Sequence, residues 1–352
     1  MFRRNKPVVG LDIGSSAVKV VELRPSGHSF KVVGFGTEPV PGDTIVDGAI
    51  IDAAAVADAV ARALDASRIK TKDVVASLSG NAVIVKKINL PVMTEAELSE
   101  SIHWEAEQYI PFDIQDVNLD YQILSTRPGD GRGSMEVLLV AAKKDRITDY
   151  TDVINKTGRT AVVVDVDAFA VQNAYEANYD LEPGVVVALL NIGASGVNIN
   201  IVSGEQSLFT RDISIGGNAF TEAIQKELGL PFDSAERVKK GEPMDGVDPA
   251  DVAPILRTVT ESLLLEIQKT FDFFKATAAS DRIDRVLVSG GTSRVDGFVD
   301  RLAERFGTPV ELFDPFRKIQ FDPKRFGIER VEDVAPTSAV AVGLALRRAG
   351  DR

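Results

Sequence analysis

The sequence predicts an α/β protein built from two copies of one domain. Strand-like runs rich in Val and Ile alternate with helical stretches along the 352 residues. A chain of this length exceeds what one hydrophobic core usually supports, so two domains are expected. Residues 8–19 also align with residues 187–198 at an offset of 179, near the start of each half of the chain, which favours a duplicated domain over a chance likeness of two apolar hairpins. The identities are Leu11/Leu190, Ile13/Ile192, Gly14/Gly193, Ser16/Ser195 and Val18/Val197.

The elements follow from hydrophobic periodicity and from start and stop signals. Alternating or continuous Val- and Ile-rich runs predict strands over 8–13, 17–23, 74–77, 83–88, 137–141, 161–165, 185–191, 197–202, 207–212 and 285–289. Spacings of three and four residues predict helices over 52–68, 95–110, 145–156, 218–228 and 251–279. Thr94 and Glu97 form a capping-box pattern before the second helix, and Pro111 stops it. Gly/Pro/Asp-rich segments 127–134 and 241–250 are predicted surface loops.

Composition excludes several kinds of chemistry. The chain has 40 Lys and Arg against 52 Asp and Glu, a net charge of −12, which argues against a general nucleic-acid binder. It has no cysteine and two histidines, so thiolate metal sites, disulfides and histidine relays are not expected. No apolar run approaches 18 residues and no signal segment is evident, so we expect a cytoplasmic protein without direct membrane insertion.

The two repeated hairpins carry residues suited to phosphate. A glycine between two strands, at Gly14 and Gly193, lets backbone N–H groups point into a concavity, and serine hydroxyls lie beside it. Asp12 ends the first strand and could hold a hydrated Mg²⁺, while Lys19 lies in the next strand and could reach a phosphate. For one copy alone, an ordinary hairpin with a solvated lysine is the alternative.

A third glycine turn follows the predicted strand 285–289. Gly290 and Gly291 precede a helix that we expect to begin near Ser293, and backbone amides at such a junction can accept an anion or nucleotide. The guanidinium of Arg294 could stack on a base. The segment matches neither the Walker A pattern nor the dinucleotide-binding glycine fingerprint.

Together, the three turns resemble the superfamily of actin, heat-shock chaperones and sugar kinases. The resemblance implies a duplicated actin-like (ribonuclease H-like) two-lobed fold that binds ATP and Mg²⁺ between its lobes. Segments 162–170 and 336–346 resemble its two connecting segments, and 235–239 resembles the helix that holds ribose and adenine. The nucleotide-binding residues that the resemblance implies are Gly14, Ser15, Ser16, Lys19, Gly193, Ala194, Ser195, Glu236, Lys239, Gly290, Gly291, Thr292 and Arg294, with Asp12 holding Mg²⁺ through water.

Within that superfamily the chain is most similar to the PilM family of type IV pilus assembly proteins. The likeness is carried by the opening 9–23 and by the run 99–112, which resembles a signature of a small extra α+β subdomain in the first lobe. It implies lobes over 1–165 and 166–352, with the extra subdomain near 71–145 and a nucleotide-capping subdomain near 216–280. It also implies a partner, the N-terminal cytoplasmic tail of the inner-membrane protein PilN, and contact with other pilus assembly proteins. Tyr109, Pro111 and Phe112 are candidates for the peptide groove, although an aromatic cluster after a helix is as often local core.

One departure concerns hydrolysis. Asn191 stands where ATPases of the superfamily usually have Asp, and an amide carries no charge to hold metal or orient water. Asp165 and Asp167 could compensate, or one of them could cap the helix that follows. We expect Asp12, Asp165 and Asn191 to be the catalytic positions of an ATPase that is weak at most.

Two other functions of the same fold are alternatives. A small-molecule kinase needs a carboxylate base and a substrate pocket, and segment 71–135 offers no sugar-reading cluster. An FtsA-like cell-division protein anchors through an amphipathic C-terminal helix, and no such pattern follows residue 346.

Overall fold

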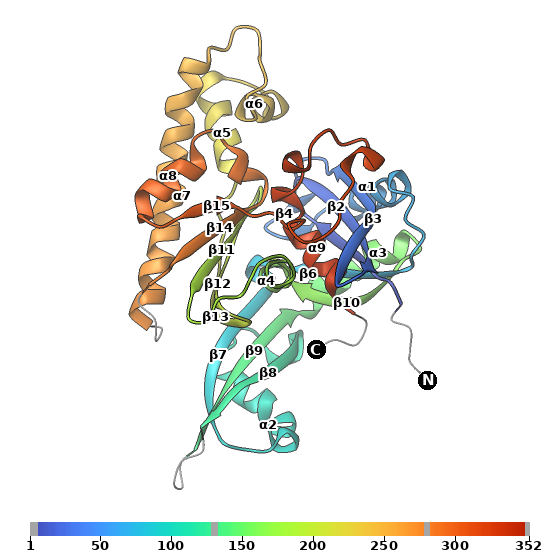
Figure 1. Ribbon diagram of the computed structural model, residues 1–352, viewed down its shortest axis with the longest axis vertical. Coiled ribbons are helices and arrows are strands. Elements are labelled where there is room, and N and C mark those ends of the chain that lie inside the picture. The colour runs from blue at the N-terminus through green and yellow to red at the C-terminus, as the bar shows by residue number, and fades with distance from the viewer. Residues whose placement is uncertain (1–5, 128–132, 278–281, 349–352) are drawn as a thin grey trace. The chain divides into compact units, whose positions relative to one another are not determined.

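The computed structural model describes residues 6–127, 133–277 and 282–348. It consists of two compact units, one of Met1–Gly80 with Val153–Arg352 and one of Asn81–Asp152. Figure 1 shows the course of the chain and the element labels. The inserted unit begins at Asn81 and ends at Asp152, whereas the sequence predicted 71–145.

The first sheet of the larger unit is five-stranded, in the order β10-β6-β1-β2-β3. β1 pairs antiparallel with β2 and parallel with β6; β2 pairs antiparallel with β3, and β6 parallel with β10. All five residues of β1 are buried, which explains its continuous apolar run. The strands are β1 (Val9–Ile13), β2 (Ala17–Ser26), β3 (Ser29–Pro39), β6 (Asp73–Leu78) and β10 (Thr160–Val166).

The second sheet repeats this topology. Its order is β13-β12-β11-β14-β15, with β11, β12 and β13 antiparallel and β14 and β15 parallel to β11. Strand for strand it matches the first sheet, so the duplication predicted from the repeat is confirmed. The strands are β11 (Val186–Ile192), β12 (Val197–Ser203), β13 (Gln206–Ile213), β14 (Arg285–Ser289) and β15 (Val310–Leu312).

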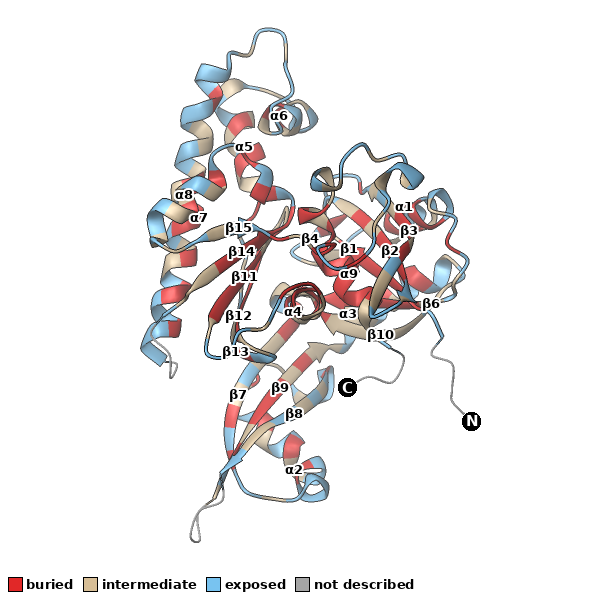
Figure 2. Ribbon diagram, viewed as in Figure 1, coloured by how far each residue is buried: buried red, intermediate tan, exposed pale blue. Residues whose placement is uncertain are grey.

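Helices cover both faces of the second sheet, and two of them also pack on the first. One core joins the apolar face of β11 and β12 to helices α5, α7 and α8. Another joins the opposite face to α4 and α9, and α9 also packs on β1 and β2. In Figure 2 these strands and helices carry most of the buried residues. The helices are α1 (Ala53–Ala66), α4 (Asp167–Asn178), α5 (Asn218–Leu228), α6 (Phe232–Lys239), α7 (Pro249–Thr277), α8 (Phe298–Phe306) and α9 (Ala339–Leu346).

Helices α4 and α9 approach each other very closely. A Cβ added at Gly343 would lie 1.7 Å from the carbonyl oxygen of Ala170, so a side chain cannot be accommodated there without separating the helices. Gly343 is therefore required for this close approach.

The smaller unit is a three-stranded antiparallel sheet in the order β7-β9-β8, with α2 packed on one face. The predicted capping box at the start of α2 is confirmed, because Thr94 N donates to Glu97 Oε2 at 2.7 Å and Glu97 N to Thr94 Oγ1 at 3.3 Å. Its elements are β7 (Val83–Pro91), α2 (Glu95–Glu107), β8 (Val117–Arg127) and β9 (Ser134–Lys143), and α3 (Lys144–Lys156) leads out of it.

Three sequence expectations need correction or completion. The helix expected near Ser293 begins instead at Phe298, after a 3-10 turn over Gly291–Arg294 and a left-handed Gly297 with φ of 70°. Strands β3, β8 and β15 were not predicted, because their side chains are largely intermediate or exposed and give little apolar signal. Parts of the predicted loop 127–134 and the end of the predicted helix 251–279 lie outside the described residues.

Two short strands, β4 (Ile45–Val46) and β5 (Ala49–Ile50), form a separate two-stranded sheet.

Candidate functional site

The two repeated glycine turns face each other. In the first, Gly14 N donates to Ala17 O at 3.2 Å; in the second, Gly193 N donates to Gly196 O at 2.8 Å. The turns meet directly, because Ser15 Oγ donates to Ser195 Oγ at 3.0 Å. Topology thus brings together two tight turns separated by half the chain. Ser16, in contrast, is exposed, and its carbonyl oxygen accepts from Val40 N.

The first hairpin places a buried acid beside a lysine. Asp12 and Lys19 are cross-strand partners on β1 and β2, and Lys19 Nζ lies 2.9 Å from Asp12 Oδ2. Their side chains are 13% and 17% exposed, so the pair is shielded but can be reached from solvent. The register that follows from the seven-residue spacing explains why the two charges meet.

The corresponding pair in the second hairpin is neutral. Asn191 and Asn198 are cross-strand partners, and Asn191 Nδ2 donates to Asn198 Oδ1 at 2.9 Å. Ser289 Oγ also donates to Asn191 Oδ1 at 3.3 Å. Asn191 is therefore held by two side chains, and the second turn lacks the charges of the first.

The negative charge of Asp12 acts on a second acid, Asp167. Burial raises the pKa of Asp167 to about 6, and repulsion from Asp12 and Asp212 adds to this, while hydrogen bonds from Ser77 and Ser79 oppose it. Ser77 Oγ donates to Asp167 Oδ1 at 2.5 Å. Asp165 has a different partner, because its Oδ2 lies 3.3 Å from Arg347 Nε.

Asp12 and Asp167 are the carboxylates that could take part in magnesium binding. In the part of the chain that the structure describes, no group of three acidic or histidine side chains is arranged to chelate a metal ion directly. The repulsion between Asp12 and Asp167 is nevertheless what a hydrated divalent cation would relieve. The donor set fits Mg²⁺ held through its waters and through a ligand's phosphates, because this ion keeps several waters.

The third glycine turn packs against the second. Gly290 has φ of 89°, and a Cβ there would lie 2.2 Å from Ile192 O, so only glycine fits without displacing the strand end. Thr292 Oγ1 donates to Gly193 O at 2.8 Å, and Thr292 is buried. Nothing lies within 4 Å of a Cβ at Gly291, which is open space. Arg294 is held by a hydrogen bond from its Nη1 to Asp333 O at 2.9 Å.

A fourth glycine turn, which contains a Gly-Gly pair, was not predicted from the sequence. Gly216 and Gly217 lie between β13 and α5, and a Cβ at Gly216 would lie 2.7 Å from both Gly193 O and Ala194 O. Gly217 N donates to Gly193 O at 2.9 Å. A Gly-Gly pair between a strand and a helix was the available signal, the same one that marked Gly290 and Gly291.

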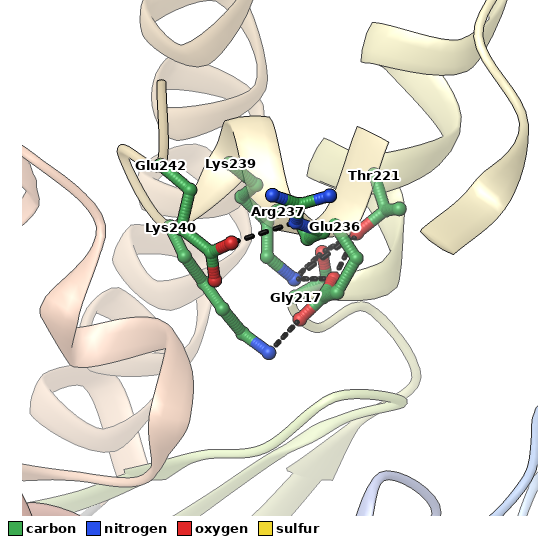
Figure 3. A network of polar contacts seen from close by, with 7 residues as sticks. All are labelled: Gly217, Thr221, Glu236, Arg237, Lys239, Lys240 and Glu242. Carbon is green, nitrogen blue, oxygen red and sulfur yellow. Dashed lines mark hydrogen bonds and ion pairs between the residues drawn. The ribbon is translucent and has the colours of Figure 1, made fainter. Parts of the chain in front are cut away.

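Helix α6 joins this group through the network in Figure 3. Lys239 Nζ pairs with Glu236 Oε2 at 2.5 Å and also donates to Thr221 Oγ1 at 3.0 Å and Gly217 O at 3.2 Å. Burial lowers the pKa of Lys239 despite the Glu236 partner. Burial acts to raise the pKa of Glu236, but Lys239 and Thr221 outweigh it and lower that pKa. Lys239 thus has all three donors engaged, whereas the side chain of Lys240, paired with Glu236 at 3.2 Å, is 57% exposed.

A cavity of about 450 Å³ lies beside the third glycine turn. It is bounded by the end of α6, the loop after it, the first half of α7 and the start of α8. Its walls are apolar in part, from Val238, Met244, Val247, Val252 and Leu256. The charged side chains that line it are the basic Lys239, Lys240, Arg257, Arg294 and Arg301 and the acidic Glu242 and Asp296.

The predicted peptide residues lie in the smaller unit. Tyr109 and Phe112 are partly buried against its core, and Lys143 Nζ lies 4.2 Å from the centre of the Phe112 ring. Pro111 between them is exposed. Tyr109 and Phe112 therefore contribute to local packing while retaining some accessible surface.

Within the described residues, no helix has the length and apolar character needed to cross a bilayer. Comparison with solved structures shows that this chain has the actin-like fold. MreB5 of Spiroplasma citri bound to AMPPNP covers 96% of this chain and 94% of its own, with a TM-score of 0.52 and 15% identity. The cell division protein FtsA of Streptococcus pneumoniae serotype 2 is 23% identical over 346 residues, covering 87% of this chain and 75% of FtsA.

A PilM–PilN type IV pilus biogenesis complex contains a more similar chain. It is 31% identical, with a TM-score of 0.86, and the match covers 97% of this chain and 98% of that one. The family model for type IV pilus assembly protein PilM matches residues 10–349, which include all of the glycine turns described above. This chain therefore belongs to the PilM family of type IV pilus assembly proteins.

Proposed function

We propose that this protein is an ATP-binding scaffold of type IV pilus assembly that holds the N-terminal cytoplasmic tail of a PilN-like inner-membrane protein. It would lie at the cytoplasmic face of the inner membrane through that partner and contact other pilus assembly proteins. Family membership supports the role in pilus assembly. The observation that best supports nucleotide binding is the hydrogen bond between Ser15 and Ser195, which brings the two glycine turns together.

The phosphates would bind between these turns. They would take the place of the Ser15–Ser195 hydrogen bond, with backbone amides of both turns and Lys19 Nζ as donors. Asp12 would hold Mg²⁺ through water, and the ion would offset the repulsion between Asp12 and Asp167. Ser16, Ala194 and Gly193 complete the two turns.

The adenosine would occupy the cavity beside the third turn. Its volume of about 450 Å³ suits a base and ribose, and its walls combine apolar surface with basic side chains. Gly291, where a Cβ would have open space, would let the nucleotide approach the backbone, and Gly290 would keep this turn packed against Ile192. Arg294 and Lys240, which line the cavity, would flank the base. Lys239 would keep Glu236 oriented toward the ribose, since its donors are already engaged.

Hydrolysis should be slow or negligible. Asn191 is neutral and is held by Asn198 and Ser289, so it cannot act as a general base. Asp167, with a pKa of about 6, is the remaining candidate for orienting water, because Asp165 is paired with Arg347. A phosphate-release rate on the order of 1–10 s⁻¹ would contradict this expectation.

The test combines two measurements on the intact protein. Isothermal titration with ATP, with and without Mg²⁺, should show binding that Gly290→Val abolishes, because the added side chain meets Ile192 O. Gly42→Ala is the matched control, since a Cβ there has open space around it. ATP affinity unchanged by Gly290→Val would overturn the nucleotide assignment.

The peptide part is tested separately. A synthetic N-terminal tail of PilN should bind in a pull-down, and Phe112→Ala should weaken it. Val92→Ala is the control, because Val92 is a 46% exposed apolar residue of the same unit. If no tail peptide binds with or without ATP while a small molecule is phosphorylated, the scaffold function is wrong.

A further inference from the structure

A row of three side chains crosses the second sheet at the glycine turn. Asn191, Asn198 and Asp212 are successive cross-strand partners on β11, β12 and β13. Asn191 Nδ2 donates to Asn198 Oδ1 at 2.9 Å, and Asn198 Nδ2 donates to Asp212 Oδ1 at 2.9 Å. The matching row of the first sheet is Asp12, Lys19 and Thr37, with its charges on the first two strands. In the second sheet the one charge stands on the third strand.

Asp212 also reaches the first sheet. Its Oδ2 accepts from Gly80 N at 2.5 Å. Gly80 follows β6, and the same segment carries Ser77 and Ser79, which hydrogen-bond Asp167. One carboxylate therefore joins β13 of the second sheet to the end of β6 in the first, close to the acids of the proposed site.

The Asp212 carboxylate fixes the orientation of the two amide groups in the row. An ionised Asp accepts hydrogen bonds and donates none, so it requires Asn198 to present Nδ2 toward it. Asn198 must then present Oδ1 to Asn191, which turns Asn191 Nδ2 toward β12 and leaves its Oδ1 for Ser289 Oγ. Burial raises the pKa of Asp212, while the donors Asn198 and Gly80 stabilise its charged form.

We propose that Asp212 is a positioning residue that fixes the Asn191 carboxamide through Asn198 and tethers the two sheets through Gly80. Its effect on nucleotide rests on the proposed ATP site; the tether does not. Removing the Asp212 charge lets the Asn191 and Asn198 amide groups flip and weakens the hydrogen bond from Gly80 N. The two glycine turns at Gly14 and Gly193 should then spend less time in contact.

The sequence allows a clean test because the chain has no cysteine. Ser15→Cys with Ser195→Cys replaces two hydroxyls that lie 3.0 Å apart, so disulfide formation under mild oxidation reports the contact of the turns. Adding Asp212→Asn should slow this cross-linking about tenfold, and Asp212→Asn in the cysteine-free chain should weaken Mg·ATP binding by about the same factor. The matched control is Asp284→Asn, whose carboxylate accepts from Val186 N at 2.8 Å at the opposite end of β11.

A second variant separates positioning from a general structural role. Asn198→Asp combined with Asp212→Asn moves the carboxylate to the middle of the row, where it accepts from both neighbours, so cross-linking and affinity should recover. Equal cross-linking rates with and without Asp212→Asn, or no recovery in the double variant, would overturn the proposal. If the rates change as expected while the unaltered protein binds no ATP, the tether stands and the proposed nucleotide function fails.

Discussion

Charge is distributed unevenly between the two glycine hairpins. Asp12 and Lys19 neutralise each other across the first hairpin, whereas Asn191 and Asn198 form an amide pair at the same place in the second. Burial raises the pKa of Asp167, and the negative charge of Asp12 raises it further. We therefore expect single residues to decide how the proposed site responds to magnesium and to pH.

Replacing Asp12 should remove the magnesium dependence of nucleotide binding. We expect Asp12→Ala to bind Mg·ATP about ten- to a hundredfold more weakly, because a charged hydrogen-bond partner of the hydrated ion is lost. Titration with ATP in Mg²⁺ and in EDTA measures the difference, and the exposed Asp58→Asn on α1 serves as control. An unchanged response to Mg²⁺ would remove Asp12 from the site.

Asp167 should make stability depend on pH. Its pKa is raised from 3.8 to about 6 on folding, so the folded protein binds more protons than the unfolded chain between these values. Its contribution is therefore most favourable below pH 4 and falls by up to about 3 kcal/mol as the pH rises through 6.

The neutral variant Asp167→Asn isolates this effect. Without nucleotide or Mg²⁺, urea unfolding at pH 4.5, 6 and 7.5 should show the variant gaining stability relative to the unaltered protein as the pH rises. A difference that stays constant over this range would contradict the assignment.

At the scale of elements, close backbone approach organises the site. Gly290 lets the end of β14 pass against Ile192, and Gly216 packs against the second turn, so three strand ends converge. Gly343 does the same for α4 and α9, the helices that share a core with both sheets. These glycines are required for packing between elements.

The helix contact predicts a large stability loss from a small change. Gly343→Ala places a Cβ 1.7 Å from Ala170 O and should lower the free energy of unfolding by about 3 kcal/mol or more. Urea denaturation measures it, with Gly42→Ala as the control that has no close neighbour. Equal midpoints for both variants would show that α4 and α9 can separate without cost.

At the scale of the molecule, both sheets and all four glycine turns belong to one compact unit, while the predicted peptide residues belong to the other. Nucleotide bound between the two turns would contact both sheets at once. Since such a ligand binds only the folded unit, it should stabilise that unit as a whole.

Calorimetry tests this expectation. At about a hundred times its dissociation constant, Mg·ATP should stabilise the larger unit by about 2.7 kcal/mol and raise its Tm by a few degrees. Mg²⁺ alone is the control and should have a much smaller effect. No shift under saturating Mg·ATP would contradict binding between the sheets.

The duplication, most strand and helix positions and three of the four glycine turns could be predicted from the amino-acid sequence. This was possible because these features rest on local signals: alternation, capping residues and glycines at strand ends. The seven-residue spacing of Asp12 and Lys19 also anticipated their pairing, which depends only on a tight hairpin.

Which acids lie close to Asp12 could not be predicted from the sequence, because it depends on how distant segments pack. Asp165 and Asp167 are two residues apart, yet Asp165 pairs with Arg347 while the pKa of Asp167 is raised by burial and by the charge of Asp12, because β10 ends between them and α4 begins. Asp212 could not be found locally, since its partners Asn198 and Gly80 come from a neighbouring strand and from the other sheet. Position across a sheet depends on strand order and register, and distant segments must pack together before either is fixed.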